Sequence, residues 1–340
     1  MSETAEPPEF TGVKDYLPFV FMALLFLVVE VLAVALTPSF KQAGLQATKN
    51  PQDPTNSIIY VVFILVFTLF LLAALKYSFD WIIEVFVLLS ASALVYYVLS
   101  VFFPFAVAVA LALGLAVLIY VYPEWYVLDV GGVLMGAGGA GIFGISFGIL
   151  PSLVLLVVLA VYDAVAVYRT KHMLTLADGV MDMKLPIMFV IPRSLDYSFI
   201  EEGEKVEVED REEESEESER DDEAESEEAR SGEDEGDRET EAELQERDAF
   251  FMGLGDAVIP SVLIASAAHF LGTNYGVALV ENYAVLGAVM GSFVGFTVLM
   301  YQVSKGKPQA GLPLLNGGTI LGFVIGGLAL DIPLIKLVGL

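Results

Sequence analysis

Long apolar runs alternate with short polar segments along most of this chain. Each run matches the roughly 20 residues that an α-helix needs to cross the hydrocarbon of a bilayer. Pro104 separates the third run from the fourth, and Pro151 separates the fifth from the sixth. The pattern predicts an all-α, polytopic membrane protein with nine transmembrane helices. The expected spans are approximately 16–37, 57–76, 79–103, 104–121, 128–149, 150–168, 249–272, 277–301 and 311–334.

Composition supports this prediction and locates the charge. The 340 residues are 56% hydrophobic, whereas soluble domains are about 45–50% apolar. Residues 201–248 carry a local net charge of −21, which leaves only −6 of the total −27 for the rest of the chain. No basic patch of the kind that binds nucleic acid is evident. The sequence has no cysteine, which excludes disulfides and thiolate chemistry.

The basic residues indicate how the spans are oriented, because loops on the cytosolic side carry an excess of Lys and Arg. A cytosolic N-terminus gives eight basic residues to the inner loops and three to the outer loops. The C-terminus is then extracytosolic. The inner residues are Lys14, Lys76, Arg169, Lys171, Lys184, Arg193, Lys305 and Lys307, and the outer residues are Lys41, Lys49 and Lys336.

A long insert divides the spans into two groups. Residues 1–168 hold the first six expected helices, residues 169–248 form a cytosolic loop, and residues 249–340 hold the last three. The stretch 173–200 mixes apolar and polar residues, so we expect it to lie on the membrane surface or to form short strands against the helices. From about residue 201 the loop is an acidic tract that cannot bury enough apolar surface to fold, and we expect disorder.

Two aspartates interrupt the apolar runs. Asp163 lies in the sixth expected span and Asp256 in the seventh, each about 9–10 Å from the cytosolic end at 1.5 Å per residue. An ionisable group at membrane depth indicates a functional site. Consecutive spans tend to be antiparallel neighbours, so the two carboxyl groups can face each other at one depth.

Such a pair of carboxyl groups suits peptide hydrolysis. Two carboxylates a few ångströms apart cannot both ionise cheaply, so they share one proton. The ionised member can activate water while the protonated member polarises a carbonyl. Gly253 and Gly255 leave space beside Asp256. Pro260 cannot donate to the carbonyl of Asp256, and we expect the helix to bend or loosen between these two residues.

Two motifs carry a family resemblance. Tyr162-Asp163 and Gly253-Leu254-Gly255-Asp256 resemble the YD and GxGD motifs of the presenilin and signal-peptide-peptidase family of intramembrane aspartyl proteases. The family places these motifs on the sixth and seventh of nine helices, with a large cytosolic loop between them. Its third motif, Pro-Ala-Leu near the start of the ninth helix, is matched by Ala310-Gly311-Leu312-Pro313-Leu314, in which Ala replaces the first Pro.

The resemblance implies roles for ten residues and a class of substrate. The chain would cut peptide bonds within transmembrane segments of other membrane proteins, without a cofactor, and it resembles archaeal members that reside in the cell membrane. Nothing in the sequence indicates accessory subunits. The implied catalytic residues are Asp163 and Asp256, their neighbours are Tyr162, Gly253, Leu254 and Gly255, and the implied substrate-binding residues are Gly311, Leu312, Pro313 and Leu314.

Other functions remain open at this stage. A proton- or cation-coupled transporter, or an ion channel, could use the same buried aspartates. The metalloprotease signature His-Glu-x-x-His is missing, so no metal site is expected. Among the other acidic residues, we expect Glu30 to be a polar group paired between helices. Asp129 lies near the start of its span, where a helix N-terminus favours an acid.

Overall fold

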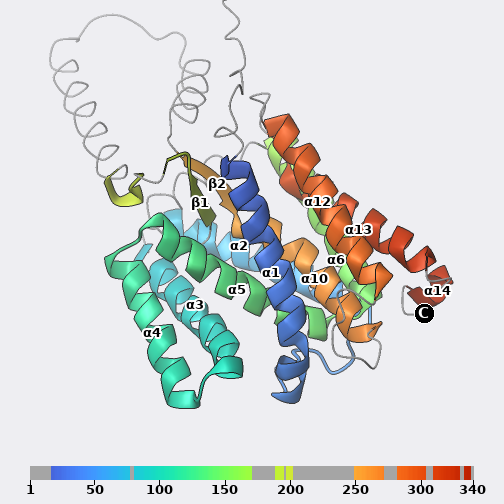
Figure 1. Cartoon of the computed structure of the whole chain (residues 1–340), viewed down its shortest axis with the longest axis horizontal. Helices are drawn as coiled ribbons and strands as arrows, with labels where there is room; N and C mark the ends of the chain where they lie inside the picture. Colours follow the sequence, from blue (N-terminus) through green and yellow to red (C-terminus); the bar gives the residue numbers. More distant parts are fainter. Residues whose placement is uncertain are drawn as a thin grey trace, which may run out of the picture.

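The computed structural model describes most of the chain outside the acidic insert. Most of the described residues are helical, and the strands among them are one short pair (Figure 1). The described residues are 17–76, 80–170, 188–194, 197–201, 249–271, 282–303, 309–329 and 333–337. The elements are α1 (Leu17–Gln42), α2 (Thr55–Lys76), α3 (Asp80–Phe102), α4 (Phe105–Val121), α5 (Trp125–Ser146), α6 (Ile149–Val165), a π-helical turn (Ala166–Thr170), β1 (Met188–Pro192), β2 (Ala249–Gly253), α10 (Leu254–Phe270), α12 (Tyr283–Val303), α13 (Gly311–Leu328) and α14 (Leu334–Leu337).

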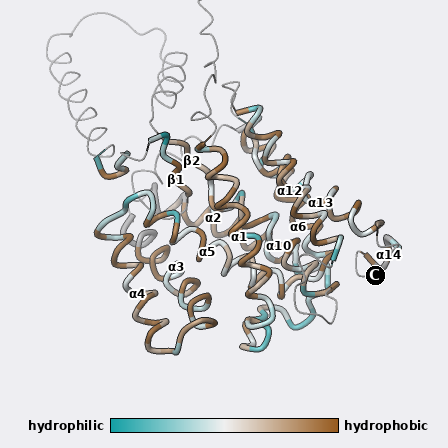
Figure 2. The backbone as a smooth tube through the Cα atoms, viewed as in Figure 1, coloured by the Kyte–Doolittle hydropathy of each residue, from teal (hydrophilic) through white to brown (hydrophobic). Residues whose placement is uncertain are grey.

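The helices have the length and composition of membrane spans. Within the described ranges, six are long and apolar enough to cross a bilayer, in α1, α3, α5, α6, α12 and α13. Shorter apolar helices lie in α2, α4 and α10. Large apolar side chains also cover the outside of the bundle, as Leu69, Val294 and Ile325 do, and Figure 2 shows apolar residues along most of each helix. These observations confirm an integral, multi-pass helical membrane protein.

Helix α5 is the centre of the bundle and the most buried of the six candidate spans. Helices α1 and α10 pack against it, the α3–α4 pair lies on one side, and the α12–α13 pair lies on the other (Figure 1). Its glycines permit these approaches, because an added Cβ would lie 2.9 Å from Val98 of α3 at Gly138 and 2.5 Å from Ala265 of α10 at Gly144. The glycine-rich fifth span therefore serves close helix packing.

Among the described glycines, those between α12 and α13 mark the closest approach of two helix backbones. Three glycines on each helix face the other helix, and an added Cβ at any of the six would overlap a backbone carbonyl oxygen of the partner helix. This is the small-xxx-small pattern, in which side-chain-free positions let two helix backbones touch. The six glycines are Gly287, Gly291 and Gly295 of α12 and Gly318, Gly322 and Gly326 of α13.

The strand pair differs from the predicted seventh helix. Strands β1 and β2 are antiparallel with Val190 opposite Phe251. Residues 249–253, expected to begin the seventh span, are therefore extended, and the helix begins only at Leu254. Phe250 and Phe251 are compatible with a strand, and pairing with the distant β1 decides in its favour. The strand alternative for the region before residue 200 is confirmed by β1, whereas residues 202–248 lie outside the described part.

The hydrogen bond that is missing between Asp256 and Pro260, as expected from the proline, does not end the helix. Helix α10 continues through Pro260 to Phe270. Pro260 lies in the second turn of the helix, and a ring there removes one hydrogen bond without ending a helix that is packed on α5 and α1. The departure from helical structure lies upstream of Asp256, in β2, rather than downstream of it.

Candidate active site

Asp163 lies near the end of α6, two residues before its last residue, Val165. Its side chain is buried, with 5% of its surface exposed. One carboxyl oxygen, Oδ2, accepts a hydrogen bond of 3.1 Å from the backbone N–H of Leu312. The π-helical turn Ala166–Thr170 follows directly. Asp163 is thus a buried carboxyl group held by the backbone of another helix, α13.

Asp256 occupies the first turn of α10, as the third residue of that helix. The strand β2 runs into α10 with no residue between them, and Gly253 is the N-cap. The carboxyl group therefore projects from the junction of a strand and a helix. The N–H groups of a first helical turn have no partner within the helix, and they favour a negative charge at this place.

Gly311 and Leu312 bring the two aspartates together. An added Cβ at Gly311 would lie 3.2–3.3 Å from the carboxyl atoms of Asp256. The next residue, Leu312, donates its N–H to Asp163. The two carboxyl groups are also near enough to interact electrostatically. The start of α13 therefore contacts both aspartates, as the sequence predicted for this segment, and three elements distant in the sequence meet here.

The other residues of the expected site differ in their proximity to the carboxyl groups. A Cβ at Gly253 would lie 3.7 Å from Oδ2 of Asp256, and at Gly255 it would meet only Ile259, at 4.0 Å. Space beside Asp256 is therefore open, as expected. Leu254 instead packs toward Gly136 of α5. Tyr162 is 43% exposed, whereas the adjacent Asp163 is buried.

Leu314 and Pro313 lie further along α13. The backbone of Leu314 packs against Gly295 of α12. Pro313 is the third residue of α13, where its missing N–H costs nothing because first-turn N–H groups lack helical partners. These two residues support the start of α13, whereas Gly311 and Leu312 contact the carboxyl groups.

Sequence reasoning missed two polar residues that hold the site together. Asn316, one turn after Leu312, donates from Nδ2 to the carbonyl of Leu156 on α6 at 2.9 Å. Asp129 of α5 accepts the N–H of Val190 in β1 at 2.9 Å, so it does more than favour a helix start. A buried polar side chain in an apolar run was the available signal in both cases. Glu30 is paired as expected, with Ser292 of α12 donating to it at 2.6 Å.

The hydrogen bond from the N–H of Val190 to Asp129 also shows which backbone groups lie on the outer edge of each strand. In an antiparallel pair the N–H and C=O of one residue point to the same side. Since the N–H of Val190 points to Asp129, away from β2, the pair Val190–Phe251 does not exchange hydrogen bonds. Phe251 therefore directs its own N–H and C=O away from β1, along the outer edge of β2.

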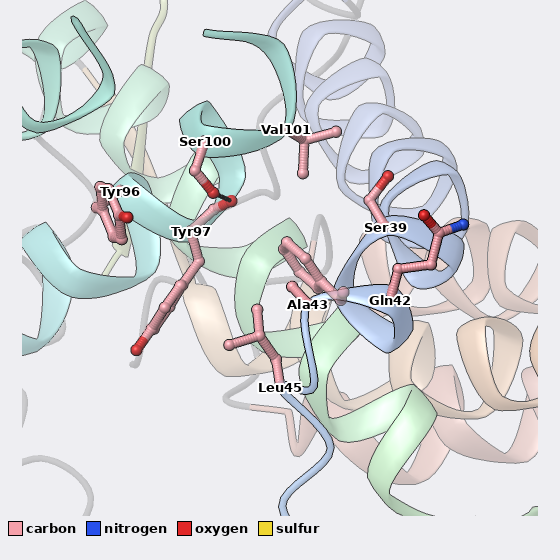
Figure 3. A pocket seen from close by; sticks show the side chains of 9 residues that line it. Ser39, Gln42, Ala43, Leu45, Tyr96, Tyr97, Ser100 and Val101 are labelled. Atoms are coloured by element: carbon pink, nitrogen blue, oxygen red, sulfur yellow. Dashed lines mark hydrogen bonds between the residues drawn. The ribbon is translucent and has the colours of Figure 1, made fainter. Parts of the chain in front are cut away.

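A cavity lies apart from this site. A pocket of about 560 Å³ lies between the ends of α1 and α3 (Figure 3), and its lining, which includes Ser39, Tyr97 and Ser100, contains no residue of the candidate site. Among the described residues, no group of three or more His, Cys, Asp or Glu could hold a metal ion.

Comparisons with known proteins agree with this geometry. The family model described as signal-peptide peptidase, presenilin aspartyl protease matches residues 22–332. Two solved structures of a presenilin family intramembrane aspartate protease, in space groups C222 and P2, are similar to the chain. The first is 33% identical, covering 92% of this chain and 100% of that one with a TM-score of 0.61. The second is 34% identical, covering 93% and 99% with a TM-score of 0.58.

No curated protein matches the chain. The family match nevertheless extends over nearly the whole sequence, and both structural matches cover almost all of each chain. The chain therefore belongs to the signal-peptide peptidase and presenilin family of aspartyl proteases.

Proposed function

We propose that Asp163 and Asp256 are the catalytic pair of this intramembrane aspartyl protease. The single observation that carries the proposal is the placement of Gly311-Leu312 against both carboxyl groups. A proton shared between the two aspartates leaves one ionised to activate water and one protonated to polarise the scissile carbonyl. The same groups then protonate the leaving amine and exchange roles. The transporter alternative is not favoured by the family to which the chain belongs.

The substrates are transmembrane segments of other proteins, and such a helix must unwind locally before it is cut, because its carbonyls are hydrogen-bonded. We place the unwound segment beside the outer edge of β2. Phe251 offers an N–H and a C=O there, two residues before Gly253, and an extended peptide adds to a free strand edge by backbone pairing. Gly253, Gly255 and Gly311 keep side chains out of the space that the substrate backbone would enter.

The proposal includes a topology of nine spans with a cytosolic N-terminus. Six long apolar helices and three shorter ones support the count, and the basic residues support the orientation. In this topology the aspartates lie toward the cytosolic side, and residues 1–168, 169–248 and 249–340 are the six-helix, loop and three-helix parts of the chain.

Proteolysis by the purified full chain in liposomes tests the catalytic pair. With a transmembrane peptide as substrate, Asp163→Asn and Asp256→Asn should each lower the cleavage rate by at least about 10²-fold, the smallest effect typical of a general acid or base. Thermal unfolding in detergent is the control for folding. Wild-type rates in either variant would refute the shared pair.

A further inference from the structure

Three positions along one face of α5 contact the strand β1 and the first residue of α10, the helix that carries Asp256. Asp129 accepts the N–H of Val190 in β1. One turn later, a Cβ added to Gly132 would lie 2.9 Å from the ring of Phe189, also in β1. A further turn on, at Gly136, it would lie 3.1 Å from Leu254, the first residue of α10. Spacings of three and four residues place these three positions on one side of the helix.

Among these contacts, only the one made by Asp129 fixes the strand along its own axis. Apolar contacts such as that of Phe189 hold β1 against α5 but are not directional. A hydrogen bond of 2.9 Å to one N–H selects which residue of β1 stands opposite Asp129. A slip of one residue would turn the N–H of Val190 toward β2 and reverse the face of every side chain in the strand.

The position of β1 is passed on to β2, the strand that runs into the helix of Asp256. Five consecutive pairs, Met188–Gly253 to Pro192–Ala249, connect β1 to β2. The last residue of β2, Gly253, is the N-cap of α10. Helix α10 is held on α5 by separate contacts, of Leu254 with Gly136 and of Ala265 with Gly144. The register of the strands relative to α5 therefore sets where the outer edge of β2 lies relative to the carboxyl group of Asp256, with Gly253 as the junction.

A second carboxylate on the same helix end holds the chain that follows β1. Glu124, the N-cap residue of α5, accepts hydrogen bonds from Ser198 Oγ at 2.7 Å and from the N–H of Phe199 at 3.2 Å. Asp129 and Glu124, at the start of α5, thus bind the chain before and after Arg193 and Ser194. The strand pair is therefore attached to α5, the most buried of the six candidate spans.

We propose that Asp129 is a positioning residue of the protease, and that its bond to Val190 determines which peptide bond of the substrate is cut. The inference rests on the proposed function of Asp163 and Asp256 and of the β2 edge. An extended substrate advances about 3.3 Å per residue along the strand. A displacement of β2 by that distance would bring the neighbouring peptide bond to the aspartates.

The test compares cleavage products of Asp129→Leu and Asp129→Asn with those of the wild type. The full chain is assayed in liposomes on one transmembrane peptide, and mass spectrometry identifies the cut positions. Asn keeps an oxygen that accepts the N–H of Val190, so it should keep the cut positions. Leu has a similar volume without an acceptor, so the ratio of the two main products should change about fivefold or more, and kcat should fall on the order of tenfold.

The product ratio separates positioning from mere destabilisation. A smaller folded fraction lowers all products equally and leaves their ratio unchanged, so unchanged cut positions and ratio in Asp129→Leu would overturn the proposal. If that variant does not accumulate, Gly132→Ala decides, because its Cβ displaces the ring of Phe189 without removing a polar group. It should also redistribute the products, and an unchanged distribution would count against the proposal. The lipid-facing Val130→Leu is the matched control on α5.

The inference and the proposed function fail in different ways. Cleavage by Asp256→Asn at the wild-type rate would refute the assignment of Asp163 and Asp256 as the catalytic pair. If cleavage requires both aspartates but wild type, Asp129→Leu and Gly132→Ala give the same products, only the positioning role of Asp129 is refuted.

Discussion

Two adjacent residues, Gly311 and Leu312, connect the carboxyl groups of the candidate pair. Leu312 contributes a backbone N–H, which no change of side chain other than proline removes. Gly311 contributes the absence of a side chain, because a Cβ there would lie 3.2–3.3 Å from three atoms of Asp256. The family motif has a small residue at this point of the ninth helix, and the geometry gives a steric reason for it. The replacement of the preceding Pro by Ala310 leaves both contacts in place.

The family motif carries Ala at the place of Gly311, so one methyl group fits there, and a larger side chain is the sharper test. Gly311→Val should lower proteolysis, because its branched side chain would push the carboxyl group of Asp256 aside, and we expect a loss of activity on the order of tenfold, since misplacement by about 1 Å can cost up to about 10²-fold. The matched control is Gly317→Val on the same helix, where a Cβ meets nothing within 4 Å. Rates of peptide cleavage in liposomes measure both. Equal activity of the two variants would contradict the steric role of Gly311.

At the scale of whole elements, the pair α12–α13 holds the start of α13 in place. Its six facing glycines bring the two backbones into contact, and Asn316 connects α13 to α6 near the site. Helix association in a bilayer depends on such packing, because lipid tails are as apolar as the side chains that they replace. The position of Gly311 and Leu312 thus depends on contacts along the full length of α13.

Gly322→Ala should destabilise the protein. Its Cβ would overlap the carbonyl oxygen of Gly287, and backbone atoms cannot turn aside, so the two helices must separate. Overpacking of this kind costs about 1–3 kcal/mol. Thermal unfolding in detergent should show a lower Tm for Gly322→Ala than for Gly139→Ala on α5, where a Cβ meets nothing within 4 Å. A Tm equal to that of the wild type would show that α12 and α13 are not held by this contact.

Most of the elements could be predicted from the sequence, and the exceptions are informative. Apolar runs separated by Pro104 and Pro151 correctly separated α3 from α4 and α5 from α6. The run beginning at Ala249 was read as helix because its hydropathy is the same in a helix and in a strand. Pairing with β1, 57 or more residues earlier in the chain, determines the outcome, and no local pattern contains that information.

The candidate site was predictable to a similar extent. Asp163 and Asp256 stand out because a charge in an apolar run is rare, and the segment Gly311-Leu312 followed from the resemblance. The structure adds the contacts of Gly311 and Leu312 with the two carboxyl groups, together with Asp129 and Asn316. Asp129 was read as a helix-start acid, since a sequence shows which helix carries a carboxylate but not which distant N–H it accepts. Contacts between distant elements therefore account for the missed residues.

For the whole molecule, the central placement of α5 separates two kinds of surface. One face of α5 supports the strand pair and α10, and the outer helices turn large apolar side chains toward the bilayer (Figures 1 and 2). The site lies where α6 ends and α10 and α13 begin, which is a single end of the bundle. If the N-terminus is cytosolic, this end is the cytosolic one, and products released there enter the cytosol.

Because the sequence contains no cysteine, single cysteines can report the orientation directly. Lys49 precedes α2 in the connection from α1, and Ser194 follows β1, and both are exposed. With a cytosolic N-terminus, Lys49→Cys should react with a membrane-impermeant maleimide on intact cells. Ser194→Cys should react only after the membrane is permeabilised. The cysteine-free wild type reports background labelling, and cleavage activity of each variant confirms its fold. The reverse pattern, with Ser194→Cys labelled on intact cells, would invert the orientation and place the aspartates toward the outer side, since Ser194 lies at the same end of the bundle as the strand pair and the start of α10.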